Sequence, residues 1–115
     1  MVETKRIFAA FYESANGKEP VREWLLELEK VDRKIIGEDI ATVEFGWLVG
    51  MPTCRRLGEK LWEVRSSLPR NRITRVIFTI MGNQVVLLHG FIKKTAKTSN
   101  DDITLARKRL KEISI

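Results

Sequence analysis

The feature that most constrains the fold is a set of three strand-like segments in the second half of the chain. The segments cover residues 60–66, 72–81 and 85–92, and each is rich in residues that favour strands or a buried position. A short proline-containing bend and the turn dipeptide Gly82-Asn83 are all that separate them. Strands with such short connections pair antiparallel, so the sequence predicts a three-stranded meander. The continuously apolar segment 85–92 is expected inside the sheet.

Three further elements precede the meander. Residues 6–12 are typical of a strand. A first helix is predicted from Pro20, which suits an initial helical turn, and a second from the N-cap residue Asp32 to a point between residues 46 and 52. The two helices are expected to form a helical hairpin. Apolar residues repeat at helical spacing at Val21, Trp24, Leu25 and Leu28, and again at Ile36, Ile40, Val43 and Trp47.

A last helix is predicted to begin near Thr98 or Ser99. Asp101 and Asp102 fall in its first turn, where the helix dipole favours negative charge. Its apolar face consists of Ile103, Ala106, Leu110 and Ile113. The predicted order is β-α-α-β-β-β-α, an α+β fold, and a length of 115 residues fits a single domain over residues 1–115.

The composition is typical of a protein that folds inside the cell without covalent crosslinks. Hydrophobic residues make up 43% of the chain, enough to bury a core. The single cysteine, Cys54, excludes an internal disulfide and suits a reducing compartment. The apolar run 7–12 is too short for a signal-peptide core, and no segment has the length of a membrane span. We expect a soluble, cytoplasmic protein with no membrane partner.

The positive charge is concentrated in the second half of the chain. Residues 1–52 carry 7 basic and 10 acidic side chains, a balance of −3, whereas residues 53–115 carry 14 and 5, a balance of +9. Such asymmetry indicates an anionic partner for the second half, most commonly nucleic acid and next an acidic protein. The simpler interpretation is a solvated basic surface.

Several classes of site are excluded or weakly supported. The single histidine, His89, excludes a two-histidine metal site, and no phosphate-binding loop or dinucleotide glycine pattern is present. We therefore expect no metal and no small-molecule cofactor. A nucleophilic pair of Cys54 and His89 is formally possible, but no feature of the sequence brings the two together.

Basic residues gather at one end of the predicted meander, without neighbouring carboxylates. The end of one antiparallel strand adjoins the start of the next, so these residues are expected to converge on one edge of the sheet. They are Arg65, Arg70, Arg72, Arg75, Lys93 and Lys94. Such a cluster suits a scissile phosphate, because arginine binds phosphate oxygens bidentately and keeps its charge.

RNA is a natural substrate for such a cluster, because its 2′-OH is a built-in nucleophile that the protein need only orient. Lysine can donate or accept the protons. Phe91 is a candidate for stacking on an unpaired base and Lys97 for binding RNA, although Phe91 also fits a core position. His89 fits a structural role with its ring nitrogens satisfied.

The segments Leu57–Arg65, 87–95 and 106–109, with a strand that opens at Arg72, resemble the phage-derived HigB-like toxins of the RelE/ParE superfamily. The most distinctive stretch is Leu-His-Gly-Phe-Ile-Lys-Lys at residues 88–94. The resemblance implies a small twisted, mainly antiparallel sheet packed under two helices, with a third helix at the carboxyl end.

The resemblance also implies a function. HigB-like toxins are metal-independent endoribonucleases that cut mRNA in the ribosomal A site, and a cognate helix-turn-helix antitoxin neutralises them. By position, Arg65 and Arg72 match the phosphate-binding arginines of these toxins, and Lys93 and Lys94 match the basic residues that end the last strand. Arg75 matches less closely.

The sequence departs from relatives that place a tyrosine or histidine near the carboxyl end. Its only tyrosine is Tyr12, so proton transfer is left to Lys93, Lys94 or His89, or to weak general catalysis. Two other functions remain open at this point. One is inhibition of DNA gyrase, as in ParE-like relatives, and the other is a non-enzymatic RNA-binding or phage regulatory role.

Overall fold

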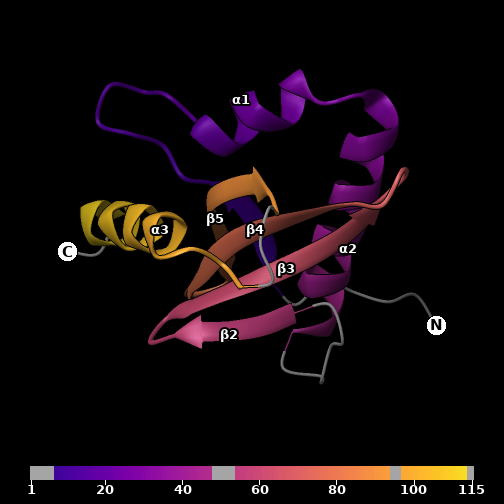
Figure 1. Cartoon of the computed structure of the whole chain (residues 1–115). Helices are drawn as coiled ribbons and strands as arrows, with labels where there is room; N and C mark the ends of the chain where they lie inside the picture. The colour runs from indigo at the N-terminus through magenta and orange to yellow at the C-terminus, as the bar shows by residue number, and fades with distance from the viewer. Residues whose placement is uncertain (1–6, 48–53, 94–96, 114–115) are drawn as a thin grey trace.

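The predicted meander is present and forms three neighbouring strands of a five-stranded sheet (Figure 1). The computed structural model describes residues 7–47, 54–93 and 97–113. The elements in chain order are β1 (Phe8–Phe11), α1 (Pro20–Glu27), α2 (Lys30–Gly46), β2 (Cys54–Gly58), β3 (Leu61–Leu68), β4 (Arg72–Met81), β5 (Gln84–Ile92) and α3 (Asn100–Ile113). The α+β class is confirmed, and the observed order contains one strand more than predicted.

The sheet has the order β1-β5-β4-β3-β2. All pairs in β2 to β5 are antiparallel, whereas β1 pairs parallel to β5. β5 therefore has a neighbour on each side, which confirms the interior position expected from its apolar sequence. The β1 pairing runs only from Phe8–Gln84 to Phe11–Leu87. Beyond Leu87, the edge of β5 that faces away from β4 has no strand partner among the described residues.

The additional strand, β2, was not predicted. It is short and pairs only with β3, and its register is interrupted between Arg56 and Gly58. Cys54 packs against the core on one face of the sheet and Leu57 against the core on the other, both only partly buried. An edge strand with exposed Arg55 and Arg56 lacks the apolar alternation on which a sequence prediction depends.

The helices cover both faces of the sheet. α1 and α2 pack on one face, with α1 against β5 and α2 against β3, and α3 packs on the other face against β5 and β4 (Figure 1). The expected helical hairpin is not a side-by-side pair, because α1 and α2 meet at a wide angle and lie over different strands (Figure 1). A two-residue link leaves little freedom for α2 to fold back along α1.

Each face has its own core. The α1/α2 side buries residues such as Ile36, Val43 and Phe78, and the α3 side buries Leu61, Ile77 and Leu88. Burial of each large apolar side chain contributes about 1.5–3 kcal/mol. The part of the chain that the structure describes holds no helix with the length and apolar character of a membrane span.

The start of α2 differs from the prediction in a way that matters for the site. The helix begins at Lys30, with Glu29 in the N-cap position, so Asp32 lies inside the first turn. Asp32 does not cap the helix. Its carboxylate is buried and accepts hydrogen bonds from Arg72 of β4. A tertiary ion pair has thus replaced the local capping role that the residue type suggested.

Candidate functional site

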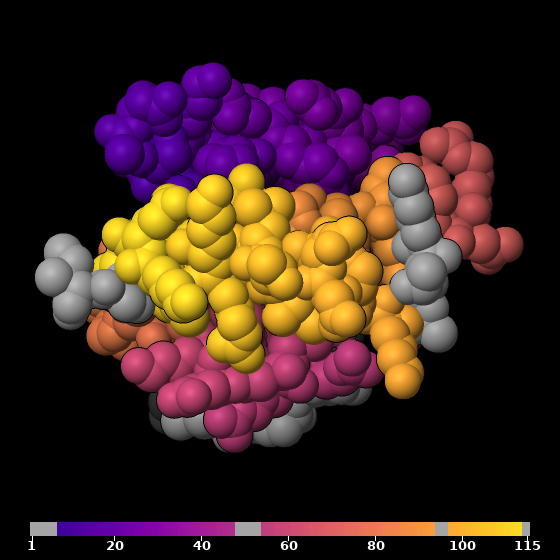
Figure 2. All heavy atoms as spheres, turned by 60° about the vertical axis from the view of Figure 1, so that its left-hand side comes forward, coloured from indigo at the N-terminus to yellow at the C-terminus, as the bar shows by residue number. Residues whose placement is uncertain are grey.

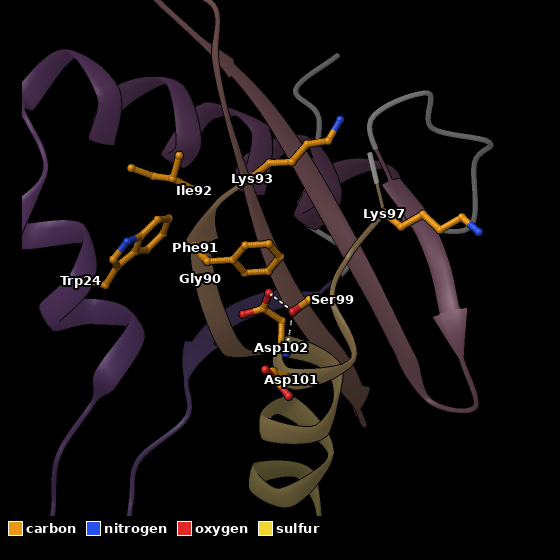
Figure 3. Close-up of a pocket in the computed structure, with 9 residues that line it drawn as sticks. All are labelled: Trp24, Gly90, Phe91, Ile92, Lys93, Lys97, Ser99, Asp101 and Asp102. Atoms are coloured by element: carbon orange, nitrogen blue, oxygen red, sulfur yellow. Dashed lines mark hydrogen bonds between the residues drawn. The ribbon is translucent and has the colours of Figure 1, made fainter. Parts of the chain in front are cut away.

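A cavity of about 640 Å³ follows the free edge of β5, between α1 and the first turn of α3 (Figure 3). It exists because β1 ends early and leaves the last residues of β5 uncovered on that side. Trp24 of α1 lies on one side of β5 and Phe91 on the other (Figure 3). The lining residues are Trp24, Gly90, Phe91, Ile92, Lys93, Lys97, Ser99, Asp101 and Asp102.

Gly90 is required for the wall that Trp24 forms. A Cβ atom at this position would lie 2.4 Å from the Trp24 ring, far inside van der Waals contact. Only glycine therefore lets the indole lie directly on the strand. The sequence suggested a core role for Trp24, and the ring does pack against the α1/α2 core. It also forms one side of the cavity, which helical spacing alone did not reveal.

His89 is fixed by a hydrogen-bond network at the start of α3. The His89 Nε2 lies 2.7 Å from Asp102 Oδ1, and the Ser99 hydroxyl donates to the other oxygen of Asp102 at 2.6 Å. The Asp102 backbone N–H donates back to Ser99 at 3.1 Å, so Ser99 also caps the helix. The His89 ring stacks on Phe91 at 5.3 Å between ring centroids. The Nε2 partner supports the expected structural role of His89.

Two of the predicted basic residues, Lys93 and Lys97, line the cavity. The Lys93 backbone N–H donates to the Ile73 carbonyl of β4 at 2.8 Å, which holds the residue at the end of the sheet. Lys97 is exposed on the segment that leads into α3 (Figure 3). Lys94 lies outside the described residues, so its predicted role stays a prediction.

Arg75 is buried and engaged within the protein. Its side chain lies 3.1 Å from Glu63 and donates a 2.7 Å hydrogen bond to Thr98, which in turn donates to Glu63. All three side chains are at least 90% buried. This network ties the segment before α3 to the sheet and so positions Lys97. A direct contact between Arg75 and RNA, as the sequence suggested, does not fit this burial.

Arg72 is separated from the cavity. It binds Asp32 through two guanidinium nitrogens, at 2.8 and 3.0 Å, and its Nε donates to the Pro69 carbonyl at 3.1 Å. This hydrogen bonding from Arg72 lowers the pKa of Asp32 below its ordinary value, and burial opposes the shift. Arg72 faces α2, whereas Arg75, three residues along the strand, faces α3. The expectation that the two converge is wrong, because successive strand residues point to opposite faces.

The remaining arginines divide between the two faces in the same way. Arg70 lies at the β3–β4 bend with φ +64° and forms an exposed ion pair with Glu29, 3.8 Å away, on the α2 side. Arg65 is exposed and lies opposite Arg75 in the β3–β4 register, so it faces α3. Of the predicted arginines, Arg65 is thus the exposed one on the cavity side.

The expected absence of carboxylates is also wrong. Asp101 and Asp102 both line the cavity. The sequence did place them in the first turn of the last helix, but it could not show that this turn lies against the end of β5. The Ser-x-x-Asp spacing of Ser99 and Asp102 was the available signal, because it is typical of a capped helix start.

The other candidate nucleophiles lie elsewhere. Cys54 faces the α1/α2 core, and burial raises the pKa of its thiol to about 11, which disfavours the reactive thiolate. The Tyr12 hydroxyl donates to Glu112 of α3, and this bond raises the pKa of Tyr12 above its ordinary value. Neither residue lines the cavity. Among the described residues, no group of three His, Cys, Asp or Glu side chains is placed to hold a metal ion.

Comparison with known proteins identifies the family of the chain. No curated protein sequence matches the chain significantly. A family profile described as phage derived protein Gp49-like matches residues 23–111, most of the chain. The match includes Trp24, Arg65 and the whole of the cavity wall from β5 into α3. The chain belongs to this family of phage-derived Gp49-like proteins, a toxin-like family of the RelE/HigB type.

Proposed function

We propose that this chain is the toxin of a toxin–antitoxin pair, and that it cleaves messenger RNA on the ribosome by a metal-independent reaction. The observation that carries the proposal is the cavity along β5, which combines two aromatic rings with two lysines. The family match supports the toxin class, since such toxin-like proteins normally pair with an antitoxin. A helix-turn-helix antitoxin is the partner that we propose for it.

The aromatic rings suit unpaired bases. Single-stranded RNA is commonly held by stacking of bases on aromatic side chains, at about 1–3 kcal/mol per base. Trp24 and Phe91 lie on the two sides of the free β5 edge, and each contributes to the cavity wall (Figure 3). The stack of His89 on Phe91 restrains the Phe91 ring before RNA arrives. Such restraint reduces the entropy lost on binding.

The lysines suit the phosphate between two such bases. Lys93 and Lys97 line the same cavity, and Arg65 faces the same side of the sheet. Asp101 and Asp102 line the cavity too, and the Asp102 carboxylate is engaged by His89 and Ser99. The lysine ammonium groups stabilise the additional negative charge that develops on the phosphate oxygens during cleavage. The 2′-OH gives its proton to a solvent water as its oxygen bonds to phosphorus, and the 5′ oxygen of the next nucleotide leaves, so the protein needs to supply orientation and charge.

Proton transfer is assigned to Lys93 in this proposal. Lys93 lines the cavity, whereas His89 does not, and the Nε2 of His89 is occupied by Asp102. His89 and Asp102 are therefore assigned as positioning residues for Phe91 and for the start of α3. Lysine provides an N–H donor to the leaving 5′ oxygen, which gains a proton as its bond to phosphorus breaks.

The test is primer extension on mRNA from cells that briefly express the wild-type protein, Lys93→Ala or Lys111→Ala. Lys111 is a matched control, because it is an exposed lysine in the last turn of α3. We expect discrete new 5′ ends inside translated codons with the wild type and the control, and none with Lys93→Ala. Intact messages during growth arrest by the wild type would contradict RNA cleavage and redirect the search to DNA gyrase.

A further inference from the structure

The edge strand β2 adds an arginine to the α3 side of the sheet. Arg55 lies opposite Glu63 in the β2–β3 register, and the adjacent Arg56 lies opposite Trp62. Trp62 packs against the α1/α2 core, so Arg56 faces that side and Arg55 faces α3. The Arg55 side chain is 58% exposed.

Arg55 continues a row of side chains that begins at the cavity. Phe91 of β5 pairs with Arg75 of β4, which pairs with Arg65 of β3. Since neighbouring strands are about 4.8 Å apart, Arg65 lies about 10 Å from Phe91 along this row. Arg55 is a diagonal neighbour of Arg65, at a distance of roughly 7–8 Å. The row leads from the cavity wall to the edge of the sheet.

The row has a net positive charge at its surface. Glu63 is buried and lies 3.1 Å from the buried Arg75, compared with 3.6 Å from the exposed Arg55. Arg75 therefore neutralises Glu63 at short range, and water screens the longer contact with Arg55. Arg75 already balances the charge of Glu63, so the exposed guanidinium groups of Arg55 and Arg65 leave the row with an excess of positive charge.

α3 leaves Arg55 and Arg65 exposed, whereas Thr98, just before the helix, covers Arg75 between Arg65 and Phe91. The helix packs on β5 and β4, and the strands β2 and β3 lie beside it on the same surface (Figure 2). Figure 2 shows α3 across the middle of this surface, with the β2–β3 region directly below it.

We propose that Arg55 and Arg65 bind phosphates of the nucleotides that flank the cleaved one, so that single-stranded RNA runs from the cavity across the sheet to the edge at β2. This inference rests on the function proposed above and adds a second binding region to it. Contacts with phosphates are independent of sequence. They fix the path of the strand without selecting its bases.

An acidic protein segment is the other anion that such a row can bind. RNA is favoured because the exposed Arg65 is in register with Phe91, an aromatic residue of the cavity wall, across the buried Arg75. A strand whose bases enter the cavity has its next phosphates within reach of these arginines. An acidic peptide lacks bases that could stack on Phe91 at the cavity end of the row.

The experiment measures binding to a fully 2′-O-methylated uridine octamer and to the corresponding dimer over a series of KCl concentrations. Methylation blocks the 2′-OH and prevents cleavage. The variants are Arg55→Ala and the matched control Arg56→Ala, which removes the next arginine of the same strand from the opposite face. An octaglutamate peptide serves as the acidic probe.

We expect Arg55→Ala to weaken octamer binding several-fold, and more than dimer binding. The slope of log affinity against log salt should fall by about 0.7, as for one lost phosphate contact on a single strand. Arg56→Ala should bind the octamer like the wild type. Equal octamer binding by Arg55→Ala and the wild type would overturn the inference, as would an equal loss in Arg56→Ala.

A loss of octaglutamate binding that exceeds the loss of octamer binding would assign the row to an acidic partner instead. The experiments distinguish a failure of the proposed mRNA cleavage from a failure of the proposed RNA binding by Arg55 and Arg65. If messages are cleaved but Arg55→Ala binds RNA normally, the second binding region alone is wrong. If the octamer binds through Arg55 but no message is cleaved, the proposed reaction alone is wrong.

Discussion

Arg72 on the α2 face of the sheet and Arg65 on the α3 face use the same type of side chain in opposite ways. On the α2 face, Arg72 gives all three guanidinium nitrogens to Asp32 and to a backbone carbonyl. On the α3 face, Arg65 stays exposed, and Lys93 and Lys97 line a cavity. Basic residues that lie close together in the sequence therefore divide into a group that stabilises the fold and a group that lies on the cavity side of the sheet.

The difference follows from the alternation of a strand and from where the carboxylates lie. Arg72 meets Asp32, which α2 brings to the sheet, and Arg75 meets Glu63 on the neighbouring strand. Arg65 lies opposite Arg75 on the neighbouring strand and has no carboxylate partner among the described residues. A cluster of basic residues in a sequence therefore indicates an anion site only for those residues that form no ion pair with a carboxylate of the same protein.

The largest expected effect separates Arg75 from Arg65, which lie opposite each other on neighbouring strands. Arg75→Ala leaves the buried Glu63 without its closest cation, and we expect a loss of about 3–5 kcal/mol in the free energy of unfolding. Arg65→Ala removes an exposed side chain and should change stability by less than about 0.5 kcal/mol. Urea denaturation measures both. Equal losses would show that the division into ion-paired and exposed arginines is wrong.

The next effect concerns the cavity wall. Gly90→Ala forces a Cβ against the Trp24 ring, and such overpacking costs about 1–3 kcal/mol. RNA binding should weaken as well, because Trp24 must move. Gly37→Ala is the matched control, since no atom lies within 4 Å of its added Cβ and alanine favours the interior of α2 by about 1 kcal/mol. RNA binding that is unchanged in Gly90→Ala would argue against the cavity as the base site.

The smallest of these effects is a pH dependence on the opposite face. Hydrogen bonds from Arg72 lower the pKa of Asp32, so its stabilising contribution is complete above the ordinary carboxyl pKa of 3.8. It is lost as the pH falls through the lowered value. Asp32→Asn should therefore flatten the fall in thermal stability below about pH 4. RNA binding at neutral pH should not change, since Asp32 does not line the cavity.

Much of the fold could be predicted, because the meander and α1 follow local patterns. The apolar run of β5 correctly predicted its position inside the sheet, and Pro20 correctly predicted the start of α1. The strand β2 could not be predicted, since its stability comes from pairing with β3 and not from its own polar sequence. The predicted start of α2 at Asp32 was wrong, because the Asp32 carboxylate binds Arg72, forty residues away, and does not cap the helix.

The site was predictable only in part. Lys93, Lys97 and Phe91 were predicted and do line one cavity. Trp24 could not be assigned to it, because its position depends on the packing of α1 over Gly90. Arg72 and Arg75 were misjudged because the sequence does not reveal which carboxylates are close in space.

The central claim is that RNA binds on the cavity side, and the three tryptophans provide a direct test. Trp24 lines the cavity, whereas Trp47 and Trp62 pack against each other and Phe78 in the α1/α2 core. The measurement is ¹⁵N NMR of the indole N–H groups during titration with the methylated octamer, with the Trp24 signal assigned from Trp24→Phe. We predict that the Trp24 signal shifts and that the other two do not. An unshifted Trp24 signal at saturation, with shifts at Trp47 or Trp62, would contradict the account.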